Sequence, residues 1–91
     1  MQTQLGNACL AFRYLYYVEA ISLVDDKFYD LIERVAIAKG DTFLQNNIGS
    51  SNPESYSRHI IRLANTLKDI GGDTVKASII KNEKLEIFFD N

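Results

Sequence analysis

The sequence predicts an α+β fold in which an antiparallel helical hairpin, a third helix and a C-terminal β-hairpin surround one core. Two patterns lead to this prediction. Along most of the chain, apolar residues recur at spacings of three and four, as on one face of a helix. From Val75 onward they alternate with polar residues, as in a strand. The length of 91 residues and the hydrophobic content of 46% indicate a single domain, residues 1–91, with its own core.

The first predicted helix covers roughly residues 4–20. Its apolar positions follow the helical spacing and are Leu5, Ala8, Cys9, Phe12, Leu15 and Tyr16. Cys9 is the only cysteine, so the chain can form no internal disulfide. Because its neighbours are apolar, we expect Cys9 to be a small buried side chain rather than a nucleophile.

A short connector separates this helix from the second one, which we expect to end at Gly40. Either Ser22 or Asp25 is suited to cap its first turn. Its expected buried residues are Phe28, Leu31, Ile32 and Val35. Since so short a connector turns the chain back on itself, the first two helices should form an antiparallel hairpin over residues 1–40.

The third predicted helix covers residues 53–71. It follows a predicted loop over residues 41–52 that is rich in Asn, Ser and Gly. The sequence Ser51-Asn52-Pro53-Glu54 is typical of a helix start, and two glycines stand at the predicted end. Its expected buried residues are Tyr56, Ile60, Leu63, Ala64 and Leu67.

A β-hairpin is predicted over residues 73–91. Val75, Ala77 and Ile79 alternate with polar residues, and Leu85, Ile87 and Phe89 do so after the turn sequence KNEK. Phe88 gives the last strand apolar residues on both faces. We therefore expect this hairpin to contact a partner protein or a second copy of the chain.

Composition excludes several classes of function. Ten basic and 12 acidic residues give a net charge of −2 with no basic stripe, so free-standing nucleic-acid binding is not expected. One histidine and one cysteine are too few for a structural zinc site. No apolar run approaches the roughly 20 residues of a membrane span, and the first residues do not resemble a signal peptide. We expect a cytoplasmic protein without membrane contact.

An aromatic and acidic group of residues stands at the predicted hairpin. Tyr16 and Tyr17 end the first helix, while Asp26, Tyr29 and Asp30 lie on the second helix away from its apolar stripe. Tyrosine rings attract a flat cation, and carboxylates accept hydrogen bonds from a diol such as a ribose. These residues therefore predict a pocket for a cationic ring.

A simpler interpretation of the same residues stays open. Asp26 could serve as a helix cap, Asp30 could form a surface pair with Arg34, and the tyrosines could lie at the edge of the core. In that case the hairpin is only a scaffold.

The segment over roughly residues 10–40 resembles the N-terminal helical subdomain of the NAD-dependent DNA ligases. The matching residues, in the family's register, are Tyr16-Tyr17-Val18, Asp26 and Tyr29-Asp30-Leu31, followed by Ile32-Glu33-Arg34. The resemblance implies that Tyr16, Tyr17, Asp26, Tyr29 and Asp30 contact the nicotinamide mononucleotide (NMN) half of NAD. It also implies NMN or NAD as the ligand.

The chain departs from the family in ways that bear on activity. The proline common in the family's turn is absent, Lys27-Phe28 replaces Ala-Glu, and nothing resembles the lysine-bearing KxDG motif of the adenylation domain. We therefore expect no ligation and no enzyme activity. Small ligase-like proteins of this kind resemble those encoded by bacteriophages, which implies the host cytoplasm as the location.

Gly49-Ser50-Ser51 precedes a predicted helix start, where free N–H groups favour an anion. Ser50 and Ser51 are therefore candidates for holding the phosphate of a bound nucleotide. The alternative is a plain loop and cap.

Two classes of function follow from these patterns. The first is a small non-catalytic binding protein with a pocket of the nicotinamide-nucleotide type. The second is a protein–protein interaction module, such as a phage accessory factor or an inhibitor of a host protein. A fragment of a split ligase is a third, less favoured class. His59 has no second catalytic residue that the sequence places beside it.

Overall fold

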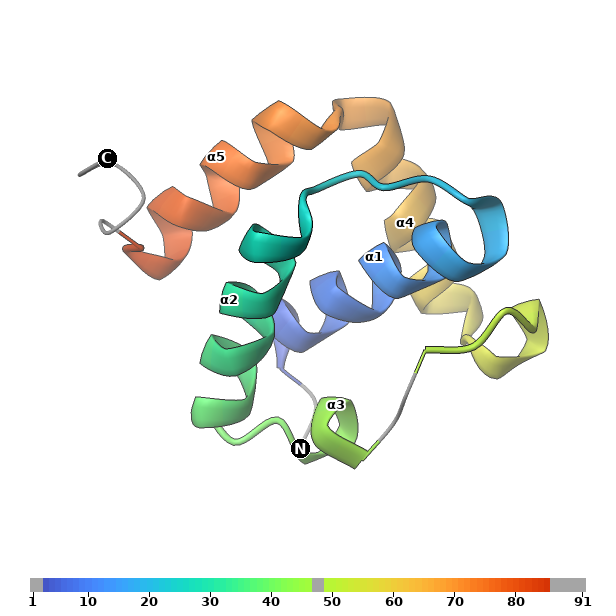
Figure 1. Ribbon diagram of the computed structural model, residues 1–91, viewed down its shortest axis with the longest axis horizontal. Helices are drawn as coiled ribbons and strands as arrows, with labels where there is room; N and C mark the ends of the chain where they lie inside the picture. The colour runs from blue at the N-terminus through green and yellow to red at the C-terminus, as the bar shows by residue number, and fades with distance from the viewer. Residues whose placement is uncertain (1–2, 47–48, 86–91) are drawn as a thin grey trace.

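A computed structural model describes residues 3–46 and 49–85, and over these ranges every regular element is a helix (Figure 1). The elements are α1 (Gln4–Glu19), α2 (Asp26–Ala38), α3 (Thr42–Asn46), the 3-10 turn η1 (Pro53–Ser55), α4 (Arg58–Ile70) and α5 (Gly72–Glu83). The predicted α+β class is wrong, because the region of the first predicted strand is helical. The fold is all-α.

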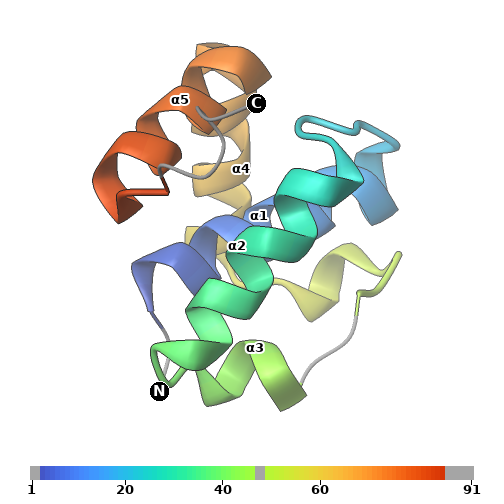
Figure 2. The same cartoon turned by 60° about the vertical axis from the view of Figure 1, so that its left-hand side comes forward.

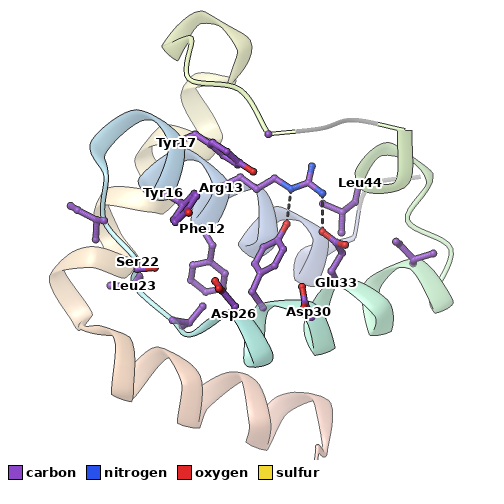
Figure 3. Close-up of a pocket in the computed structure, with 15 residues that line it drawn as sticks. Phe12, Arg13, Tyr16, Tyr17, Ser22, Leu23, Asp26, Asp30, Glu33 and Leu44 are labelled. Carbon is purple, nitrogen blue, oxygen red and sulfur yellow. Dashed lines mark hydrogen bonds and ion pairs between the residues drawn. The ribbon is translucent and has the colours of Figure 1, made fainter.

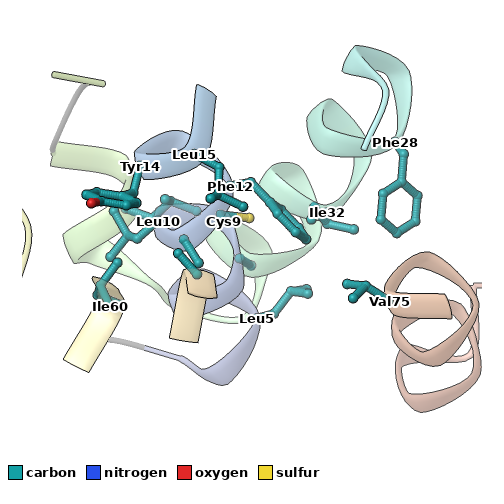
Figure 4. Packing of buried hydrophobic residues seen from close by; sticks show 14 of the residues in the cluster. Leu5, Cys9, Leu10, Phe12, Tyr14, Leu15, Phe28, Ile32, Ile60 and Val75 are labelled. Carbon is teal, nitrogen blue, oxygen red and sulfur yellow. The ribbon is translucent and has the colours of Figure 1, made fainter. Parts of the chain in front are cut away.

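Helix α1 is the centre of the molecule and contacts α2, α3 and α4 (Figures 1 and 2). It is buried on more than one face, as expected for a central helix. Its buried residues are Leu5, Gly6, Cys9, Leu10, Ala11, Phe12, Tyr14 and Leu15. The other helices add one apolar face each, and Figure 4 shows Ile32, Ile60 and Val75 meeting this centre from three elements.

The predicted first two helices are present and pack against each other. Of the two candidate caps for α2, the structure uses Asp25, whose carboxylate accepts the Phe28 N–H at 2.7 Å. Gly40 follows the end of α2 with a φ of +98°, a left-handed conformation that suits glycine.

The predicted loop over residues 41–52 contains a short helix, α3, which the sequence prediction missed. Asp41 begins it, because its buried carboxylate accepts the Leu44 N–H at 2.8 Å. The same carboxylate accepts the backbone N–H of Thr3 at 2.7 Å and the Thr3 hydroxyl at 2.9 Å. A side chain at Gly6 would overlap Asp41, so glycine leaves the room for this contact. Asp41 thus joins the start of α1 to the α2–α3 corner.

The predicted helix over 53–71 is divided. Asn52 caps the 3-10 turn by accepting the Glu54 N–H, and the chain is extended at Tyr56. Helix α4 starts five residues later than predicted, where the Ser57 hydroxyl accepts the Ile60 N–H at 3.2 Å. The start signal of the sequence is therefore real, but it starts η1 rather than α4.

The predicted β-hairpin over 73–91 is the principal correction. Gly71, with a φ of +100°, ends α4, and α5 begins at the next residue. Val75 and Ile80 are buried in α5, and Ile79, four residues after Val75, packs against the core, so the apparent alternation is part of a helical repeat. The predicted turn KNEK is the last turn of α5, with Lys84 in a left-handed C-cap. Of the second predicted strand only Leu85 is described, and the rest of that strand lies outside the described residues.

Ion pairs join α5 to both ends of α2. Lys76 of α5 donates to Asp25 at 3.2 Å and lies 5.3 Å from the centre of the Phe28 ring. At the other end, Lys39 pairs with Glu83. No helix within residues 3–46 and 49–85 is long and apolar enough to cross a membrane.

Candidate functional site

A cavity of about 540 Å³ lies between the second half of α1, the connector and the outward face of α2 (Figure 3). The five residues predicted to form the pocket, Tyr16, Tyr17, Asp26, Tyr29 and Asp30, all line it. The other described lining residues are Phe12, Arg13, Ile21, Ser22, Leu23, Val24, Glu33, Ile37, Leu44 and Gly49. The cavity therefore combines aromatic, acidic and apolar walls.

The aromatic wall comes from the last turn of α1. Tyr16 and Tyr17 pack edge to face, with ring centres 5.0 Å apart and ring planes at 90°. They remain 54% and 48% exposed, so their rings are open to a ligand. Gly49 approaches the Tyr17 ring so closely that a side chain there would overlap it.

The acidic wall comes from one stripe of α2. Asp26, Asp30 and Glu33 recur at spacings of four and three and line the cavity together (Figure 3). Helical geometry places this stripe on the side of α2 opposite Phe28 and Ile32, which are buried. This spacing places three carboxylates along one edge of the cavity.

The simpler interpretation gave these acids other roles. The cap of α2 is Asp25 rather than Asp26. Arg34 donates to the backbone carbonyl of Asp30 at 3.4 Å, and not to its carboxylate. Neither Asp26 nor Asp30 forms an ion pair with another residue in the described part of the chain. Both carboxylates thus face the cavity without a cationic partner from these ranges.

The sequence analysis missed two charged site residues, Glu33 and its partner Arg13. The Nε of Arg13 donates to the Tyr29 hydroxyl at 2.6 Å, and a terminal nitrogen donates to Glu33 at 2.9 Å (Figure 3). The Arg13 side chain is only 11% exposed, and that of Glu33 is 30% exposed. A signal was present, since Arg13 precedes Tyr16 and Tyr17 by three and four residues and so shares their helix face.

The pKa of Arg13 and the pKa of Tyr29 both lie above their usual values. Burial lowers the pKa of Arg13, but the hydrogen bonds to Tyr29 and Glu33 outweigh it and leave the pKa above its usual value. Burial raises the pKa of Tyr29 far above its usual value, although Arg13 opposes the shift. Tyr29 is therefore a neutral phenol held in place by a guanidinium.

Replacing Arg13 with alanine is expected to lower the free energy of unfolding by about 2 kcal/mol, less than a fully buried pair because Glu33 is partly exposed. The loss would leave Tyr29 and Glu33 without their donor. Urea denaturation measures it. Lys39→Ala, which breaks the exposed pair with Glu83, is the matched control and should cost about 0.5 kcal/mol or less. Equal losses in the two variants would contradict the stabilising role assigned to the contacts of Arg13 with Tyr29 and Glu33.

The phosphate candidates Ser50 and Ser51 do not line the cavity; their neighbour Gly49 does. The backbone N–H of Ser50 donates to the Tyr56 hydroxyl at 3.0 Å, and that hydroxyl donates back to the Ser50 carbonyl at 2.6 Å. The Ser50 hydroxyl forms a hydrogen bond with the Ser55 hydroxyl and also accepts the backbone N–H of Asn52. The backbone N–H of Ser50, which a phosphate would need as a donor, is therefore already used within the loop.

Other reactive groups lie away from the cavity or are unsuited to chemistry. Cys9 is fully buried, as predicted, and burial raises the pKa of its thiol to about 12. His59 is exposed at the start of α4. Within the described ranges, no three or more His, Cys, Asp or Glu side chains are grouped so as to hold a metal ion.

No protein-family model matches this sequence, and the comparisons with curated proteins and with solved structures found no match. The resemblance to the ligase subdomain therefore stays a prediction from the residues themselves.

Proposed function

We propose that this chain is a small binding protein whose cavity takes a flat cationic ring with an attached ribose, as in NMN or NAD. The observation that carries the proposal is the convergence of Tyr16, Tyr17, Asp26, Tyr29 and Asp30 on one cavity. Its volume of about 540 Å³ falls within the roughly 300–1,000 Å³ of small-molecule sites. In this proposed function no residue is catalytic, and the protein acts in the cytoplasm.

In this proposal the ligand ring lies against the exposed tyrosine faces, and the ribose lies toward α2. A cationic ring gains about 0.5–2 kcal/mol from a tyrosine face, depending on how much water is removed. Asp26 and Asp30 have the accepting oxygens that two ribose hydroxyls require. The helical hairpin would then share ligand recognition with the ligase subdomain without its ligation chemistry.

Calorimetric titration of NMN, NAD and ADP-ribose tests the proposal. NMN and NAD, which carry the cationic ring, are expected to bind, whereas ADP-ribose, which lacks it, should bind much more weakly. Asp30→Ala should weaken NMN binding about tenfold, the loss expected for one charge-assisted hydrogen bond. Asp69→Ala, an exposed acid on α4, is the control and should leave the affinity unchanged.

No heat of binding at millimolar NMN would overturn the proposal and favour the interaction module instead. Equal affinities for NMN and ADP-ribose would also contradict it, since the cationic ring would then contribute nothing.

A further inference from the structure

The charges around the cavity are unequal. Among the described lining residues, Asp26, Asp30 and Glu33 supply three carboxylates, and Arg13 supplies the single guanidinium, for a net charge of −2. A half-enclosed site of one sign concentrates ligands of the opposite sign. The wall charge therefore attracts a cation and repels an anion.

The one lining guanidinium is not available to balance an anionic ligand. Arg13 is 11% exposed and donates to both Tyr29 and Glu33. Its contact with Glu33 neutralises one carboxylate of the wall. The remaining charges, Asp26 and Asp30, are exposed and face the cavity.

Two groups that could hold a phosphate near this cavity, at Ser50 and at the start of α2, already have partners. The backbone N–H of Ser50 donates to the Tyr56 hydroxyl, and the hydroxyls of Ser50 and Ser55 are hydrogen-bonded to each other. The start of α2 is capped by the carboxylate of Asp25, which accepts the Phe28 N–H. Asp25 is paired with Lys76, so a phosphate there would lie beside the carboxylate of Asp26, which has no ion-pair partner within the described ranges and whose negative charge offsets the helix dipole.

From these observations we infer that the site selects a cationic riboside, a positively charged ring on a ribose without phosphate, over the corresponding nucleotide. The inference rests on the proposed function and specifies its ligand class. A phosphate monoester adds a charge of about −1.5 to −2 at pH 7. Asp26 and Asp30 repel that charge, while they and the tyrosine faces attract the ring.

Three ligands of nearly equal size separate the contributions of ring charge and phosphate. Calorimetry at low salt compares nicotinamide riboside, NMN and the reduced riboside, whose ring is neutral. We expect the riboside to bind about fivefold more tightly than NMN, a difference that shrinks at high salt because it is electrostatic. The reduced riboside should bind about tenfold more weakly than the oxidised one, having lost the attraction of its ring charge.

The double variant Asp26→Asn, Asp30→Asn removes the two charges and keeps the side-chain shapes. It is expected to fold, because like charges four residues apart on a helix repel each other slightly. The preference for the riboside over NMN should fall to about twofold or less in this variant. The control, Glu54→Gln with Asp69→Asn, removes two exposed acids outside the cavity lining and should retain the preference.

Tighter binding of NMN than of the riboside would overturn the inference and leave the proposed function standing. Equal binding of the oxidised and reduced ribosides would contradict both the inference and the proposed function, because the ring charge would then contribute nothing. A protein that binds none of the three ligands at millimolar concentration contradicts both the inference and the proposed function.

Discussion

Replacing Phe28 with alanine is expected to lower the free energy of unfolding by about 4 kcal/mol, near the upper end for large core deletions. Phe28 is fully buried and is one of the largest side chains with no exposed surface. Figure 4 shows its ring between α2 and Val75 of α5. Truncation would leave a void between α2 and α5. Because ion pairs join α5 to both ends of α2, the two helices cannot easily move together to close it.

Chemical denaturation of the wild type and of Phe28→Ala measures this loss. Phe43→Ala is the matched control, since its ring is 44% exposed and truncation should cost about 1 kcal/mol or less. A domain of this size has about 5–15 kcal/mol of stability in total, so Phe28→Ala should be marginally folded. Similar losses for the two variants would show that α5 does not pack on α2 as described.

Replacing Asp41 with alanine is expected to cost about 3 kcal/mol, because a helix cap and a buried acceptor are lost together. The backbone N–H groups of Thr3 and Leu44 would lose their shared acceptor. Thermal unfolding measures the loss, and Asp69→Ala, an exposed acid on α4, should change stability little. A loss below about 1 kcal/mol, the value of a simple cap, would contradict the role of Asp41 as a junction between α1 and α3.

The pH dependence of stability provides a second readout for Asp41. Burial raises the pKa of this carboxyl, but the hydrogen bonds from Thr3 and Leu44 outweigh it and hold the pKa below its ordinary value. The stabilisation is therefore fully present above the ordinary pKa of about 3.9 and is lost as the pH falls through the folded-state pKa. Asp41→Asn should show a weaker fall of stability between about pH 4 and pH 2.

Local signals predicted the N-terminal half well. The spacing of Leu5, Cys9 and Phe12 located α1 to within one residue at its end, and Asp25 was one of two candidate caps for α2. These features succeed because a cap and an apolar stripe depend on residues three or four apart.

The C-terminal half was mispredicted because a short pattern fits two periods. Val75, Ala77 and Ile79 alternate, yet Val75 and Ile79 are also four apart, as on a helix. Lys76, Ala77 and Lys81 are good helix formers, and their propensity favours the observed α5. Packing on α4 then decides between the two periods, and no local pattern contains that information.

For the candidate site too, features that depend on nearby residues could be predicted, and features that depend on packing between helices could not. Tyr16, Tyr17, Asp26, Tyr29 and Asp30 could be grouped from spacing alone, and they line one cavity. The contacts of Arg13 with Tyr29 and Glu33 join residues that are 16 and 20 positions apart on two helices. Predicting these contacts would have required knowing how α1 packs against α2.

The most direct test of the binding account is an NMR titration of the isotope-labelled protein with NMN. The account predicts saturable shifts of backbone amides at Tyr16, Tyr17 and the first turns of α2, with little change along α4. Asp30→Ala should reduce these shifts at the same ligand concentration. Amide shifts confined to α4 and α5, or none at millimolar NMN, would contradict the assignment of the cavity as the ligand site.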